Sequence, residues 1–196
     1  MKAKELDAVF GTGFTKVKDV SFGYMLNAPV PPVTDLKADV QERDHNVDVT
    51  WDATLGKLSV VAKADGDGLW IPYLGNGAGG DGDKGWGAYS HEVGDKTWVA
   101  TGKFSGCSIG KFTGPGGTRF AHFITPAAGH PCASVDSQAD QIKNATGLHT
   151  VVTYRPDTTG EAIAFMLLLN GVWHRRIVRV IGTNVMSVNA SSVPFV

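Results

Sequence analysis

Short stretches of the chain alternate apolar and polar residues, or are apolar throughout, which is typical of β-strands with one or both faces buried. The runs with this character are residues 46–51, 57–63, 69–74, 97–104, 109–112, 119–125 and 151–154. Each is predicted to be a strand. The first two would be joined by a turn near Gly56, and 69–74 would lie at a sheet edge or bulge because Pro72 cannot donate a ladder hydrogen bond.

The clearest turn signal is Asn170-Gly171, which stands between the apolar runs 161–169 and 172–181. Asn-Gly suits a type I′ turn, in which both central residues have positive φ, so these runs are predicted to form a hairpin. The best helix candidate is 135–146, and Gly147 would end it.

Residues 1–45 show no regular pattern, and a proline cluster (Pro29, Pro31 and Pro32) interrupts them. No repeat or linker divides the chain, so we expect one domain that spans residues 1–196. Many strands with few helices predict an α+β fold, with β-sandwich-like mixed sheets and one or two flanking helices. The 25 glycines among 196 residues agree with a turn-rich β protein.

Charge and hydropathy exclude several classes of partner. The 18 Lys and Arg residues nearly balance the 19 Asp and Glu residues, so we expect no nucleic-acid or membrane partner. The longest apolar run, 162–169, is too short to span a bilayer. Acidic residues interrupt the first seven positions and no apolar stretch follows, so no signal peptide is expected.

Cofactor motifs are incomplete. The glycine-rich run 75–80 has the spacing of a dinucleotide fingerprint, but no predicted helix follows it. Asp81, Asp83 and Glu92 have the spacing of three calcium-loop ligands, yet Trp86 stands where such a loop needs glycine. The histidines show no metal-ligand spacing. We therefore expect neither a metal nor an organic cofactor.

One segment combines residues that could carry chemistry. If a hairpin folds about Gly114-Pro115, Cys107 opposes His122, with Cβ atoms about 5 Å apart. A thiolate is a strong nucleophile, and a neighbouring imidazole can lower the thiol pKa or take its proton. Strand alternation would put Thr101 on the same face as Cys107, although a bulge at 105–106 would upset this. A thiol that is merely packed beside a histidine remains the alternative.

The motifs in this segment resemble a known family. They are Thr101-Gly-Lys-Phe104-Ser105-Gly106-Cys107, the pair Gly116-Gly117, and Ala121-His122-Phe-Ile-Thr-Pro126. They are similar to motifs of the Cys-His-Thr glutamine deamidases, which include the Burkholderia lethal factor, the catalytic domain of cytotoxic necrotizing factor and the chemotaxis receptor deamidase. The run Leu69-Trp-Ile-Pro-Tyr73 resembles a further stretch of the lethal factor more weakly. Outside these segments no resemblance extends, and Phe104 replaces the usual leucine.

The resemblance implies a catalytic domain with Cys107 as nucleophile, His122 as base and Thr101 as the residue that orients the base. Its implied activity is that of a toxin-like deamidase, which converts a glutamine of a target-cell protein to glutamate through a Cys thioester, without cofactor. We expect a monomer that acts in the producing cytoplasm or is delivered into a target cell by a specialised secretion system. The alternatives are a thiol protease or transglutaminase with the same dyad, and a non-catalytic β-sandwich module that binds ligand through its five tryptophans.

Overall fold

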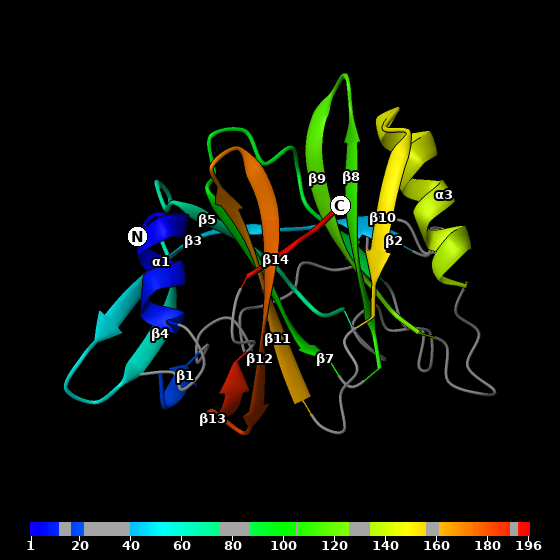
Figure 1. Cartoon of the computed structure of the whole chain (residues 1–196). Coiled ribbons are helices and arrows are strands. Elements are labelled where there is room, and N and C mark those ends of the chain that lie inside the picture. The colour runs from blue at the N-terminus through cyan, green and yellow to red at the C-terminus, as the bar shows by residue number, and fades with distance from the viewer. Residues whose placement is uncertain are drawn as a thin grey trace.

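The computed structural model describes residues 1–11, 17–21, 40–74, 87–104, 106–125, 134–155, 161–188 and 192–196, without the side chains of residues 103 and 104. Within these ranges the strands form two sheets, and two helices lie beside them (Figure 1). No helix in these ranges has the length and apolar character needed to cross a membrane.

The larger sheet closes on itself into a barrel, because its first strand also pairs with its eighth. In order around the barrel the strands are β11 (Glu161–Leu169), β7 (Trp98–Phe104), β5 (Gly68–Ile71), β3 (His45–Asp52), β4 (Lys57–Ala62), β1 (Asp19–Ser21), β13 (Asn184–Val188) and β12 (Val172–Ile181). Most neighbours are antiparallel, but β5 runs parallel to β7 and β1 parallel to β4. The short β14 (Val193–Pro194) pairs with β12 outside the barrel order.

The smaller sheet is open. Its order is β10 (Thr150–Tyr154), β8 (Ser108–Gly114), β9 (Gly117–Phe123), β6 (Gly87–Tyr89) and β2 (Val40–Glu42). One face of this sheet packs on the barrel, and the helix α3 (Val135–Thr146) covers the other face (Figure 1). The chain passes from the barrel to this sheet between β7 and β8, close to Cys107.

Alternation along the strands divides the buried residues into three layers. The barrel core contains inward residues such as Trp98 and Phe165. The interlayer core lies between barrel and open sheet, and includes Ile71 from the barrel and Phe120 from the sheet. A third core lies beneath α3. The candidate site belongs to the interlayer core.

The helix α1 (Ala3–Phe10) contributes Leu6 and Phe10 to the barrel core, where Phe10 packs against Phe165 at a ring-centroid distance of 5.0 Å. Arg176 of β12 is only 2% exposed and donates from Nε to Asp7 of α1 at 2.8 Å. Pairing with Asp7 offsets part of the cost of burying the guanidinium, and ties the helix to the barrel.

Much of the predicted secondary structure is confirmed, as is the α+β class with mixed sheets and flanking helices. The helix has the expected bounds, with Ser134 as its N-cap and Gly147 at φ 69° after its end. The hairpin of β11 and β12 turns at Asn170 and Gly171, whose φ angles of 51° and 80° fit the predicted turn. The barrel closure differs from a simple sandwich of two open sheets.

Two expectations about the elements are wrong, and three short strands were not predicted. Residues 1–45 contain α1, β1 and β2 rather than only irregular chain. The strand β5 lies between β3 and β7 instead of at an edge, because it ends at Ile71 and Pro72 falls just beyond the ladder. The short strands β6, β13 and β14 have too few residues to show a clear period in the sequence.

Candidate active site

Thr101 and His122 contact each other across the two sheets. Thr101 lies on β7 of the barrel, where it pairs with Ile71 of β5, and His122 lies on β9 of the open sheet. The Thr101 Oγ1 to His122 Nδ1 distance is 2.9 Å. Both residues are buried, with 0% and 1% of their surface exposed. The expected contact between threonine and histidine is therefore present.

A second hydrogen bond of Thr101 selects the tautomer of the imidazole. Thr101 Oγ1 donates its only hydrogen to the backbone carbonyl of Ile71 at 2.9 Å. The oxygen must then accept from His122, so Nδ1 carries the ring hydrogen and Nε2 carries the lone pair. An imidazole held in this tautomer presents a base at Nε2, as the orienting group of a catalytic triad requires.

Burial keeps this histidine neutral. Desolvation lowers the pKa of His122 to about 3, from an ordinary value of 6.5. At neutral pH the imidazole is therefore uncharged. A neutral imidazole with its lone pair at Nε2 has the form that a general base needs.

The ring of Tyr73 covers part of the imidazole. Its centroid lies 5.4 Å from that of His122, with the planes tilted by 38°. Tyr73 is 46% exposed, whereas His122 beneath it is 1% exposed. One short run, Ile71-Pro72-Tyr73, therefore supplies both the carbonyl that fixes Thr101 and the ring that shields His122. The weak resemblance at 69–73 was the only sequence signal for these contributions.

Cys107 belongs to the same interlayer core and is not in a disulfide, and 9% of its surface is exposed. The predicted pairing with His122 is wrong by two residues. The hairpin turns at Pro115-Gly116, with Gly114 opposite Gly117, so Ile109 opposes His122. If this register continued past Ser108, where the described ladder ends, Cys107 would lie diagonal to His122, at a Cβ distance of about 7 Å.

The face-sharing argument for Thr101 and Cys107 is also wrong, although both reach the same layer. Thr101 belongs to the barrel and β8 to the open sheet, and Gly106 between them has a φ of 109°. Alternation does not continue through such a break. The packing of one sheet on the other brings Thr101 to the site.

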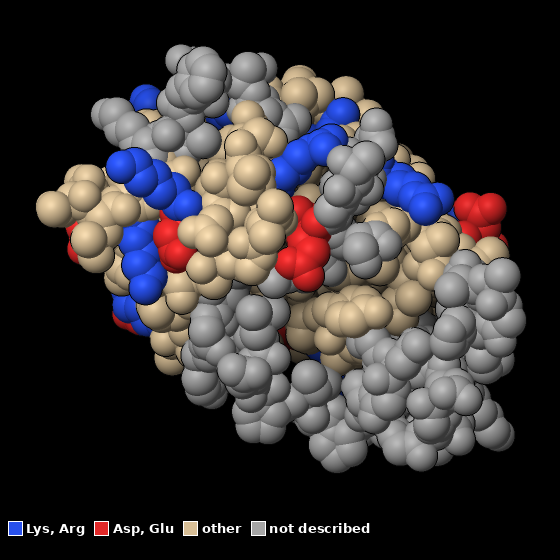
Figure 2. All heavy atoms as spheres, turned by 90° about the horizontal axis from the view of Figure 1, so that it is seen from below, with Lys and Arg blue, Asp and Glu red and all other residues tan. Residues whose placement is uncertain are grey.

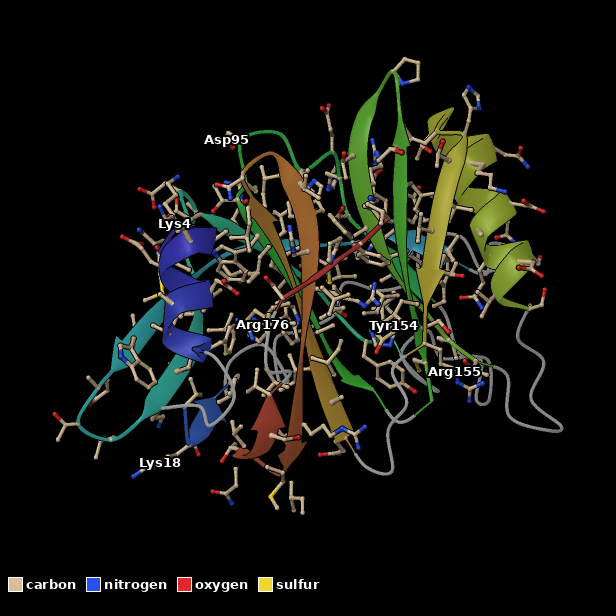
Figure 3. The ribbon with its side chains drawn as sticks, in the orientation of Figure 1. Lys4, Lys18, Asp95, Tyr154, Arg155 and Arg176 are labelled. Atoms are coloured by element: carbon tan, nitrogen blue, oxygen red, sulfur yellow. The ribbon has the colours of Figure 1, made fainter. Side chains whose placement is uncertain are left out.

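The backbone before Cys107 is held by a side chain that sequence reasoning missed. Thr125 Oγ1 donates to the Gly106 carbonyl at 2.7 Å. Arg155 also lies near Gly106. It follows the end of β10, and Figure 3 labels it beside Tyr154. Its Nη2 would lie 3.5 Å from a Cβ built on Gly106. Thr125 lies within the motif 121–126, but the motif assigned it no role, and no motif marked Arg155.

Ser105 and the glycine-rich and acidic stretch 75–86, which the sequence analysis named, lie outside the described ranges, and so does Cys132, the second cysteine of the sequence. Within the described ranges, no group of three or more His, Cys, Asp and Glu side chains could hold a metal ion. His91, for example, pairs its Nδ1 with Asp44 at 3.0 Å on the surface.

No protein-family model matches this chain, and no curated protein has a significantly similar sequence.

Proposed function

We propose that the chain is a protein-glutamine deamidase with Cys107 as nucleophile, His122 as general base and Thr101 as the residue that orients His122. The observation that carries this proposal is the hydrogen-bond chain from His122 Nδ1 through Thr101 Oγ1 to the Ile71 carbonyl, beside a thiol in the same layer. The motif resemblance supports it. We take the barrel face and open sheet around this layer as the counterpart of that family's sandwich of mixed sheets.

In the first half of the reaction, His122 Nε2 takes the proton of the Cys107 thiol as sulfur attacks the side-chain amide carbon of a glutamine. The carbonyl oxygen becomes an oxyanion, which the N–H of Cys107 can stabilise. The carbon–nitrogen bond then breaks, and the leaving nitrogen takes the proton from His122 and departs as ammonia. A thioester to Cys107 remains.

In the second half, His122 removes a proton from water as the water oxygen attacks the thioester carbon. The carbon–sulfur bond breaks, and the thiolate regains its proton from His122. The sum is glutamine plus water giving glutamate plus ammonia. The target gains one negative charge and loses a hydrogen-bond donor at that side chain.

The burial of three of the five tryptophans counts against the non-catalytic alternative, in which the tryptophans would bind ligand. Trp70, Trp98 and Trp173 are buried, so they do not line an exposed ligand surface. The low exposure of Cys107 is the observation that favours a packed, inert thiol. Thiol labelling separates the two, because a packed thiol reacts slowly. A protease would use the same groups to attack a peptide bond instead of the side-chain amide. A transglutaminase would use an amine instead of water to release the thioester.

The proposed partner is a protein of a target cell that presents an exposed glutamine, with delivery by a specialised secretion system. Seen from below, the surface carries interspersed basic and acidic side chains (Figure 2). The net charge of −1 also provides no strong attraction for nucleic acid.

The test incubates a soluble extract of eukaryotic cells with the wild-type chain, with Cys107→Ser, and with Cys132→Ser as the matched cysteine control. Peptide mass spectrometry then searches for glutamine converted to glutamate, a gain of about one dalton. We expect the conversion, with ammonia release, for wild type and Cys132→Ser but not for Cys107→Ser.

Cleaved chains in place of conversion would identify a protease, and incorporation of added methylamine would identify a transglutaminase. Conversion at the wild-type rate with Cys107→Ser would exclude Cys107 as the nucleophile. The absence of any Cys107-dependent change would overturn the enzymatic proposal.

A further inference from the structure

We propose that Thr125 is a positioning residue that aims the backbone N–H of Cys107 at the oxyanion formed during attack. This inference rests on the proposed acyl-transfer chemistry at Cys107. Its starting point is the hydrogen bond from Thr125 Oγ1 to the Gly106 carbonyl, 2.7 Å long. That carbonyl belongs to the peptide unit whose N–H is that of Cys107.

A contact that fixes the direction of a backbone C=O also fixes the direction of the N–H in the same peptide unit. A trans peptide is planar, and its C=O and N–H point in opposite directions. With the Gly106 carbonyl directed at Thr125, just beyond β9, the Cys107 N–H points away from β9. The N–H therefore points toward the side of β8 on which β10 lies. The ladder between β8 and β10 ends at Ile109 and Tyr154, so the N–H lies beyond the last described pair.

The peptide unit needs such a constraint because of the residue before it. Gly106 has a φ of 109°, outside the range that other residues adopt readily. Glycine tolerates this angle but also has access to many others, so it does little to hold the orientation of the next peptide. An oxyanion donor is effective when its direction is set before the charge develops. The Thr125 hydroxyl supplies the restraint that glycine lacks.

The alternative is that Thr125 has a purely structural role, in which it continues the β8–β9 hairpin beyond the last ladder pair. The last backbone pair in that ladder is Ser108 with Phe123, and continuing the register puts Gly106 opposite Thr125. In that case Thr125 would stabilise the end of the hairpin and affect all reactions of Cys107 alike. The two roles differ in one respect: an oxyanion forms in acyl transfer and not in alkylation of the thiol.

The experiment compares these two reactions at Cys107. Acylation by p-nitrophenyl acetate forms a sulfur–carbon bond, passes through an oxyanion and expels p-nitrophenolate, while the thiol proton leaves to base. Alkylation by iodoacetamide forms a sulfur–carbon bond as iodide leaves, without an oxyanion. Both rates are measured for the wild-type chain, Thr125→Val and Thr125→Ser, with Cys107→Ser as the blank for other reactive groups.

We expect Thr125→Val to slow acylation by on the order of 10- to 100-fold, somewhat less than the loss of an oxyanion donor outright. The alkylation rate should change less than about twofold, because the thiol and its base remain. Thr125→Ser keeps the hydroxyl and should retain most of the wild-type acylation rate. Thr113→Val, on β8 at the far end of the same hairpin, should alter neither rate.

An equal fall of both rates in Thr125→Val would overturn the inference and leave only the structural role. Unchanged acylation would overturn it as well. If Thr125→Val does not fold, Thr125→Ala supplies the comparison, and the criterion remains the acylation rate relative to wild type divided by the alkylation rate relative to wild type. Neither reagent needs a protein substrate, so the outcome of this experiment does not depend on the outcome of the deamidation test with cell extract.

Discussion

The Thr101 hydroxyl lies 2.9 Å from His122 Nδ1, although the two residues belong to different sheets. This contact joins the barrel to the open sheet through a hydrogen bond inside an otherwise apolar layer. The same hydroxyl donates to the Ile71 carbonyl, so its removal would leave two buried polar groups without this partner. Chemistry and stability are therefore coupled at Thr101.

Replacing Thr101 by valine should reduce both activity and stability. Loss of the acceptor for Nδ1–H frees the imidazole to change tautomer, and we expect kcat for ammonia release to fall on the order of 10- to 1000-fold. The unsatisfied groups should lower the free energy of unfolding by about 1–3 kcal/mol. Urea unfolding and single-substrate kinetics measure the two effects.

Thr101→Ser provides the matched control, because it keeps the hydroxyl and loses one methyl group. It should recover most of kcat while it retains a small loss of stability from the missing methyl. If Thr101→Val had wild-type kcat, Thr101 would not orient the base.

Stability should depend on pH through His122. The folded-state pKa of about 3 lies below the ordinary value of 6.5, so only the unfolded state takes up a proton between these values. This stabilising contribution is complete above pH 6.5 and is lost as the pH falls toward 3, at up to about 1.4 kcal/mol per pH unit. Urea unfolding at pH 7, 6, 5 and 4 measures the slope.

His122→Gln should show a shallower slope over the same range. NMR of the wild-type chain supplies an independent check, since the His122 ring should not titrate between pH 8 and 5. A midpoint near 6.5 would show that the ring is accessible to water.

Tyr73→Ala should raise the pKa of His122 toward its ordinary value. The tyrosine ring covers the imidazole at a centroid distance of 5.4 Å, and its removal would admit water that stabilises the charged form. Tyr73→Phe keeps the ring and should retain the depressed pKa. NMR titration of His122 in both variants is the measurement. Equal pKa values in Tyr73→Ala and wild type would exclude Tyr73 as the shield.

Gly106→Ala should destabilise the chain by about 1–3 kcal/mol, because an alanine at a φ of 109° is strained. Space is not the obstacle, since the new Cβ would lie 3.5 Å from Arg155 Nη2, an ordinary contact. Gly116→Ala in the same hairpin is the control. Its Cβ would meet Leu148 at 3.6 Å and its φ is not in the positive region, so unfolding should change little.

Local pattern was sufficient for elements whose signal lies within a few residues. The helix 135–146 could be predicted with its end at Gly147, and the turn at Asn170-Gly171 follows from the φ angles that those residues tolerate. Short strands such as β6 carry no such signal. Barrel closure also escaped prediction, because pairing of β12 with both β11 and β13 depends on twist accumulated over the whole sheet.

At the candidate site the sequence by itself determined which residue types were available. Cys107, His122 and Thr101 could be named from motifs, because a nucleophile, a base and an orienting group require those side chains. Their arrangement was decided by the tertiary structure. In the hairpin Ile109, and not Cys107, lies opposite His122. Thr101 contacts the imidazole from the other sheet. The Ile71 carbonyl, Tyr73 and Thr125 joined the site only through packing, since contacts between distant segments depend on how sheets stack and not on spacing along one chain.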